Sequence, residues 1–203
     1  LWSMCILGRG AALLPRAVLK KSWPLLMLVV VPVLVINLGG TVDTGFKWAQ
    51  FFEHAAQASV PVMLAMCIQR ADSQRIALLG KLAIAITFIA HGLFAASYYG
   101  YPPANFISMM IIGFRLSEPQ AVDWLLVAGI LDFIVAVGIF WRPTERISLW
   151  YMVGWGFLTS FARLYTNFIG WELLLPFLSR WLWEFLVRTP HYGLPVWLLR
   201  ERR

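Results

Sequence analysis

Four side chains that can bind a ligand or exchange a proton fall inside long apolar stretches of the sequence. They are Glu53, His54, His91 and Arg163. An ionisable group at bilayer depth costs about 2.5–3.5 kcal/mol on insertion scales, so such groups usually face the interior of a helical bundle and have a partner there. Their position therefore predicts a polar site inside a membrane-embedded bundle.

The predicted depths of these side chains are similar. At about 1.5 Å of rise per residue, His54 and His91 each lie about 10–12 Å below the outer ends of their helices. Arg163 lies in the outer half of a later helix, and Glu53 is the direct neighbour of His54. We therefore expect the four side chains to share one polar pocket near the outer leaflet.

Three kinds of chemistry fit such a pocket. His54 and His91 can ligate a haem iron from opposite sides, since histidine is a common axial ligand of haem. Alternatively, His54, His91 and Arg163 can donate hydrogen bonds to the carbonyl oxygens of a quinone or of another apolar molecule. In the third interpretation the groups only join helices, with Glu53 paired to Arg163 and the histidines bonded to backbone carbonyls. The residues alone leave these interpretations open.

Two further charges lie closer to the middle of the predicted membrane. Asp132 and Arg180 fall at similar depths, so we expect them to form an intramembrane charge pair that neutralises both. A proton relay through Asp132 is the alternative. Arg180, Glu184 and Arg188 follow at helical spacing and form a charged stripe on one face. That stripe either packs on the bundle or meets another subunit.

Several functional classes lack their motifs in this chain. The sequence has no phosphate-binding glycine-rich loop, no HExxH, no Cys/His cluster and no nucleophile elbow, which are the motifs of ATP-driven pumps and self-contained hydrolases. We therefore expect no metal ion and no catalytic residue. Cys5 and Cys67 form no CxxC pair, which argues against a thiol–disulfide enzyme.

The composition predicts an all-α integral membrane protein. Hydrophobic residues make up 60% of the 203 residues and charged residues 13%. The apolar stretches run about twenty residues without a period of two, which favours membrane-spanning helices over strands. We expect six spans: Trp23–Leu38, Lys47–Gln69, Ile76–Tyr99, Gln120–Trp141, Ile147–Phe168 and Trp171–Val187. The apolar segment Asn105–Phe114 is too short to cross, so we place it at the interface or as a re-entrant lid.

Small residues at close-packing spacing occur on two of these predicted helices. Gly92 precedes Ala96, and Gly156 precedes Ser160. Such pairs let two helices approach closely in a membrane. We therefore expect each pair to mark a helix crossing.

The distribution of Lys and Arg predicts the orientation. The inner segments hold Arg9, Arg16, Lys20, Lys21, Arg70, Arg75, Lys81, Arg142, Arg146, Arg188, Arg200, Arg202 and Arg203, whereas the outer segments hold only Lys47 and Arg115. By the positive-inside rule, we expect both termini in the cytoplasm and the bundle in the cytoplasmic (inner) membrane. The same rule explains the net charge of +7, so we expect no nucleic acid partner.

Two regions are predicted along the chain. Residues 1–75 hold a basic N-terminal segment and two transmembrane helices, and residues 76–203 hold a four-helix core with a cytoplasmic tail. The first span ends at Asn37-Leu38-Gly39-Gly40 without a small-x-small cleavage site. We therefore expect it to be retained rather than removed as a signal peptide.

The four-helix core, about residues 76–188, resembles the DoxX/DoxD-like membrane proteins. The resemblance rests on Ala90-His91-Gly92, on the apolar segment Pro103–Phe114, and on Gly129–Phe133 in a span that ends Gly138-Ile139-Phe140. In that family a His-Gly lies on the first core helix and often a carboxylate on the second. Asp132 stands where Glu is commoner. The resemblance implies a small membrane subunit linked to quinone-dependent redox chemistry.

The predicted polar pocket and the resemblance to the DoxX/DoxD-like proteins together predict a small accessory subunit of a larger membrane complex. We expect this complex to be linked to quinone redox chemistry. We expect the lipid bilayer and other membrane subunits as partners and a quinone as the ligand. If the chain is catalytic, it would be a component of a quinone-linked oxidoreductase. The alternatives are a purely structural scaffold subunit and a small transporter or channel.

Overall fold

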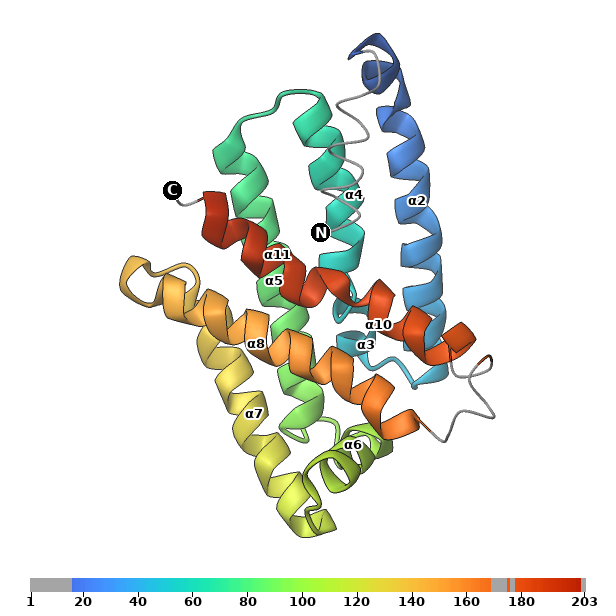
Figure 1. Cartoon of the computed structure of the whole chain (residues 1–203), viewed down its shortest axis with the longest axis vertical. Helices are drawn as coiled ribbons and strands as arrows, with labels where there is room; N and C mark the ends of the chain where they lie inside the picture. Colours follow the sequence, from blue (N-terminus) through green and yellow to red (C-terminus); the bar gives the residue numbers. More distant parts are fainter. Residues whose placement is uncertain (1–15, 169–174, 176–177, 202–203) are drawn as a thin grey trace.

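The protein is a bundle of helices (Figure 1). The computed structural model describes residues 16–168, 175 and 178–201, and these form helices joined by short turns, without strands. The helices are α2 (Arg16–Asp43), α3 (Trp48–Phe52), α4 (Ala55–Ile68), α5 (Ser73–Ala95), α6 (Ala104–Phe114), α7 (Glu118–Gly138), α8 (Arg142–Asn167), the π-helix η2 (Leu178–Leu182), α10 (Trp183–Val187) and α11 (Thr189–Glu201).

Three helices among the described residues are long and apolar enough to cross a membrane. They are Trp48–Ile68, which combines α3 and α4, then α5 and α7. Apolar side chains cover their outward faces, as Leu78, Leu82 and Ile86 do on α5. Such faces suit contact with lipid, because a bilayer leaves apolar groups no reason to turn inward. The arrangement with six spans stays a prediction, and the sixth span, residues 171–187, lies partly outside the described residues.

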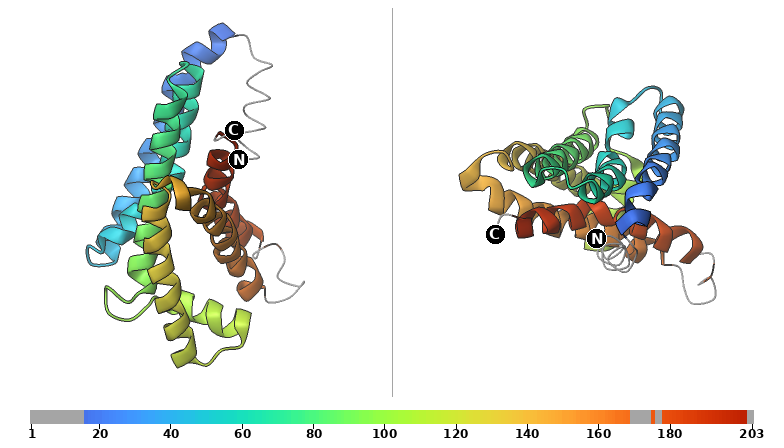
Figure 2. Two further views of the ribbon diagram at one scale, coloured as in Figure 1. Left: turned by 90° about the vertical axis from the view of Figure 1, so that its left-hand side faces the viewer. Right: turned by 90° about the horizontal axis from the view of Figure 1, so that it is seen from above.

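The helices form two layers. Helices α2, α4, α5 and α7 make one layer, and α8, α10 and α11 cross one face of it (Figure 2). Helix α6, the short apolar segment, packs against both α7 and α8 at one end of the molecule. It therefore closes the space between the two layers at that end.

The predicted C-terminal tail contains a helix, α11, that packs in the core, and its cytoplasmic location stays a prediction. His191, Leu194 and Leu198 of this helix are buried, and α11 packs against α4, α5 and α8. These residues recur at positions i, i+3 and i+7, so they form one inward-facing helical stripe. The stripe is short and lies beside prolines and arginines, so the sequence pattern of this segment is typical of a tail.

The predicted fifth span also differs from the observed helix. Helix α8 begins at Arg142 rather than Ile147 and includes the charged turn as its first turn. Glu145 of that turn is buried and forms an ion pair with Lys81 of α5 at 2.8 Å. Helix α8 is not among the three apolar spans. Helix α8 crosses the first layer rather than running beside it (Figure 2), so its polar residues reach different neighbours: Glu145 pairs with α5, whereas Tyr151 donates to Asp132 of α7.

Glycines confirm the two close helix crossings. A Cβ at Gly92 would lie 2.9 Å from the carbonyl oxygen of Gly129, so α5 and α7 touch backbone to backbone. A Cβ at Gly156 would lie 2.9 Å from the carbonyl oxygen of His191, which marks the crossing of α8 and α11. Only glycine permits such approach, and these crossings set the distances between the helices that carry the polar side chains.

Candidate functional site

A break in the second predicted span positions Glu53 and His54. Helix α3 ends at Phe52 and α4 starts at Ala55, so the two residues form the turn between them. The Ala56 N–H, left free at the start of α4, donates to the Thr87 hydroxyl of α5 at 3.0 Å. The break is therefore tied to the neighbouring helix, as the unsatisfied N–H groups of a helix start require.

Glu53 is buried and its carboxylate is held by local partners. The His54 Nε2 atom lies 3.0 Å from Glu53 Oε1, and the Gln50 amide donates to the same oxygen. The predicted pairing of Glu53 with Arg163 is therefore wrong. The helix break brings His54 and Gln50 closer to the carboxylate than any side chain of α8.

His91 of α5 contacts a histidine that lies 100 residues further along the chain. The Nε2 atoms of His91 and His191 are 3.3 Å apart, with their rings nearly perpendicular. One ring must carry the proton at this contact and the other must accept it. The predicted bonds from histidine to backbone carbonyls are replaced here by a histidine pair. His191 is not among the predicted site residues, because a tail is predicted for its segment, although its spacing to Leu194 and Leu198 is a helical signal.

The structure brings all four predicted site residues into one electrostatic cluster. The charge of Glu53 acts on His54, His91 and Arg188, and the charge of Arg163 acts on Glu53 and Arg188. His191 belongs to the same cluster. Their common depth in a membrane stays a prediction from the count of residues along each helix.

The predicted pair of Asp132 and Arg180 is wrong. Asp132 is 2% exposed and accepts a hydrogen bond from the Tyr151 hydroxyl at 3.4 Å. Arg180 is exposed, and its guanidinium lies 5.0 Å from the ring centre of Trp181. A similar predicted depth does not imply contact, and the two residues border different cavities of the bundle.

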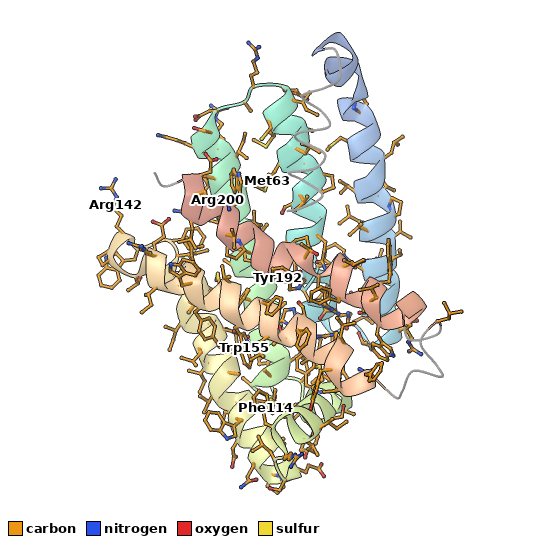
Figure 3. The ribbon with its side chains drawn as sticks, in the orientation of Figure 1. Met63, Phe114, Arg142, Trp155, Tyr192 and Arg200 are labelled. Carbon is orange, nitrogen blue, oxygen red and sulfur yellow. The ribbon has the colours of Figure 1, made fainter. Side chains whose placement is uncertain are left out.

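An apolar cavity lies between α5, α6, α7 and α8. It has a volume of about 60 Å³, and His91, Asp132 and Arg163 provide its polar groups. It adjoins an apolar groove of about 470 Å³ between α6, α7 and α8. Cavity and groove share Met110, Phe114, Trp155 and Leu158, and Figure 3 shows Phe114 of α6 below Trp155 of α8.

A polar cavity of about 520 Å³ lies on the other side of Phe106 and Arg163. Its walls are helix ends and turns rather than helix sides. They come from the α2–α3 turn, the end of α5, the start of α6 and the η2–α10 segment. Tyr101 on its rim donates a hydrogen bond to Glu118 at 2.8 Å, which raises the pKa of the Tyr101 phenol.

Phe106 and Arg163 form the wall between the two cavities. The Phe106 ring is stacked on His91, with ring centres 6.3 Å apart, and the Arg163 guanidinium lies 6.0 Å from its centre. The Nη1 group of Arg163 also donates to the Thr159 carbonyl at 3.1 Å. Arg163 therefore presents donors to both cavities from one fixed position.

The predicted ligands fit this arrangement unequally. A haem between His54 and His91 would need both Nε2 atoms, yet one contacts Glu53 and the other contacts His191. The site therefore does not fit that haem geometry without breaking both contacts. A quinone would need donors at an apolar cavity, and His91 and Arg163 border one.

No family model matches this chain. Neither the curated proteins nor the solved structures include a match. The resemblance to the DoxX/DoxD-like proteins stays a prediction that rests on its short motifs.

Proposed function

We propose that this chain is a small helical membrane protein that binds a quinone, as an accessory subunit of a quinone-linked redox complex. One observation carries the proposal. An apolar groove that opens between α6, α7 and α8 adjoins a small cavity bordered by His91, Asp132 and Arg163. Apolar walls with a few convergent polar groups are the usual form of a site for such a ligand.

The two volumes decide how the ligand would lie. A cavity of roughly 150 Å³ is enough for benzene, so the cavity of about 60 Å³ is too small for a whole quinone ring. It has room for one carbonyl edge of the ring. The rest of the ring and its apolar chain would occupy the groove of about 470 Å³.

Different side chains of the protein would then bind the carbonyl oxygen, exchange a proton and exclude water. Arg163 would donate a hydrogen bond to the carbonyl oxygen in the small cavity, and His91 would add one from Nδ1 when its Nε2 atom accepts the proton of His191. Asp132, which accepts from Tyr151, would be a group at the cavity that can give or take a proton. Phe106 and Trp155 exclude water from the ring, since both border the cavity. A bound quinone supplies the redox chemistry itself, and the protein supplies position and protons.

Two threonines on α8 offer a matched test. The hydroxyls of Thr159 and Thr166 each donate to the carbonyl four residues earlier, at 2.9 Å and 2.8 Å. Thr159 borders the apolar cavity, whereas Thr166 lies outside it. Thr159→Leu should fill the cavity and weaken binding of a short-chain ubiquinone at least tenfold. Thr166→Leu should change it less than twofold.

The measurement is equilibrium binding to protein in mild detergent, with bound quinone extracted and quantified by chromatography. Arg163→Gln removes the donor and should also weaken binding. Binding that is equal in wild type and Thr159→Leu would place the quinone elsewhere. Absence of binding to the wild type would overturn the proposal in favour of a structural subunit.

The accessory role has its own test. Affinity purification from native membranes should recover a complex with a redox-active partner, seen as a second band with a flavin, haem or iron–sulfur spectrum. A protein that runs alone on a native gel after mild extraction would contradict the subunit role. That result would leave the quinone site itself intact.

A further inference from the structure

The polar cavity carries more positive than negative charge. Its lining includes the cationic side chains of Lys47, Arg163, Arg180 and Arg188, and the carboxylates of Glu53 and Glu184. The four cations outnumber the two carboxylates, and the Glu53 carboxylate already accepts from His54 and Gln50. The cavity therefore has an excess of hydrogen-bond donors with positive charge.

Arg188 is the clearest sign that a partner is missing. The residue is only 9% exposed, and no hydrogen bond from the part of the chain that the structure describes reaches its buried Nε and Nη1 atoms. Its contact with Glu184 is 3.6 Å long, and the Glu184 side chain is 46% exposed. A guanidinium taken out of water is stable only when its donors and charge are matched. One long, half-exposed contact does not match them.

The other cations are held by aromatic rings rather than by carboxylates. Lys47 lies 5.9 Å from the ring centre of Tyr99, and Arg180 lies 5.0 Å from that of Trp181. Arg163 lies over Phe106 in the same way. Contact with a ring face orients a cation without using its hydrogen-bond donors. Apart from the Nη1 group of Arg163, which donates to the Thr159 carbonyl, these donors are therefore available to a ligand in the cavity.

We propose that this cavity binds a phosphate group. The planar fork of an Arg side chain matches the oxygens of phosphate, and each N–H to oxygen bond is assisted by charge. A volume of about 520 Å³ has room for a phosphate that carries an organic group. The head group of a phospholipid and free inorganic phosphate are the two sources of this chemistry.

This site goes beyond the proposed quinone site and does not depend on it. The two cavities share only Phe106 and Arg163 among the residues that line them. Arg188 and Arg180 belong to the polar cavity alone. Loss of phosphate binding with quinone binding intact, or the reverse, would therefore separate the two proposals.

The experiment measures the melting temperature of the full chain in dodecyl maltoside, a detergent without phosphate. Phosphatidylglycerol is titrated against diacylglycerol with the same acyl chains, and sodium phosphate against sodium chloride at equal ionic strength. Stabilisation by phosphatidylglycerol alone identifies a lipid head group as the source. Stabilisation by inorganic phosphate identifies the free anion, and either result supports the site.

Arg188→Met is the decisive variant, and Arg142→Met is its control. Arg142 is exposed at the far end of α8, away from the polar cavity (Figure 3). Arg188→Met should shift the midpoint of the phosphate response at least tenfold and raise the melting temperature without ligand, because it removes a buried unmatched charge. Arg142→Met should leave the midpoint unchanged.

A second variant keeps the test informative if Arg188→Met does not fold. Arg180 is exposed, so Arg180→Gln should fold and should still weaken the response several-fold. Absence of stabilisation by both phosphate probes would overturn the proposal. So would a full response in both Arg188→Met and Arg180→Gln.

Discussion

The two cavities share a wall of Phe106 and Arg163 but differ in every other respect. The apolar cavity lies between the sides of long helices, where His91, Asp132 and Arg163 are its main polar groups. The polar cavity lies among helix ends and turns and is lined by charged and hydroxyl side chains. The sides of helices therefore form an apolar cavity wall, whereas helix ends and turns in the same chain form a polar one.

The physical reason is the backbone. Along a helix side every N–H and C=O is bonded internally, so the wall can be wholly apolar. At helix ends these groups are left free and need polar partners. The broken segment at Glu53 and His54, the end of α5 and the η2–α10 segment supply such ends on the polar side.

Gly129→Leu should have the largest effect and should damage both cavities together. Its Cβ would lie 2.7 Å from the Ala96 backbone nitrogen, and backbone cannot move aside. We expect a loss of at least about 3 kcal/mol of unfolding free energy, the upper part of the range for overpacking. The measurement is chemical unfolding in detergent micelles, followed by circular dichroism.

Gly154→Leu is the control for that substitution. Gly154 lies on α8 with nothing near its Cβ position and is exposed. It should keep the wild-type stability within about 1 kcal/mol, because leucine is the better helix former and meets no neighbour. Equal losses of unfolding free energy in Gly129→Leu and Gly154→Leu would show that the close crossing of α5 and α7 does not cause the loss.

Phe106→Ala should merge the two cavities, with an intermediate effect. Phe106 is partly buried, so we expect a loss of about 2 kcal/mol, below the roughly 3–5 kcal/mol for a fully buried Phe. Quinone and phosphate binding should weaken together, since the ring separates the two sites. A variant that loses one ligand and retains the other unchanged would show that the ring does not separate them.

Tyr151→Phe should have the smallest effect and should change ligand binding at the apolar cavity alone. It removes the hydrogen bond to Asp132, worth about 0.5–1.5 kcal/mol. We expect weaker quinone binding with phosphate binding unchanged, measured on the same preparation. Tyr165→Phe is the matched control, since Tyr165 lies on the same helix and is 60% exposed. A phosphate response that moved with Tyr151→Phe would mean that the cavities are coupled.

Much of the helical framework could be predicted from the sequence. The apolar stretches predicted α5 and α7 closely. The short apolar segment Asn105–Phe114 lies in α6, and its place at the interface or as a re-entrant lid stays a prediction. The resemblance, the six spans, the orientation and the ligand stay predictions. The errors concern α8 and α11, whose apolar residues form stripes rather than continuous stretches. A stripe signals packing on other helices, and hydropathy averaged along the chain does not detect it.

From the sequence alone, the constant rise per residue of a helix predicts that His54, His91 and Arg163 lie at similar depths. That common depth stays a prediction. Only the tertiary structure decided which groups touch, such as His91 with His191 and Asp132 with Tyr151. Contact depends on how each helix is rotated and where it crosses its neighbours, and those are set by packing at points such as Gly92 and Gly129. Residue spacing along one helix carries no information about that rotation.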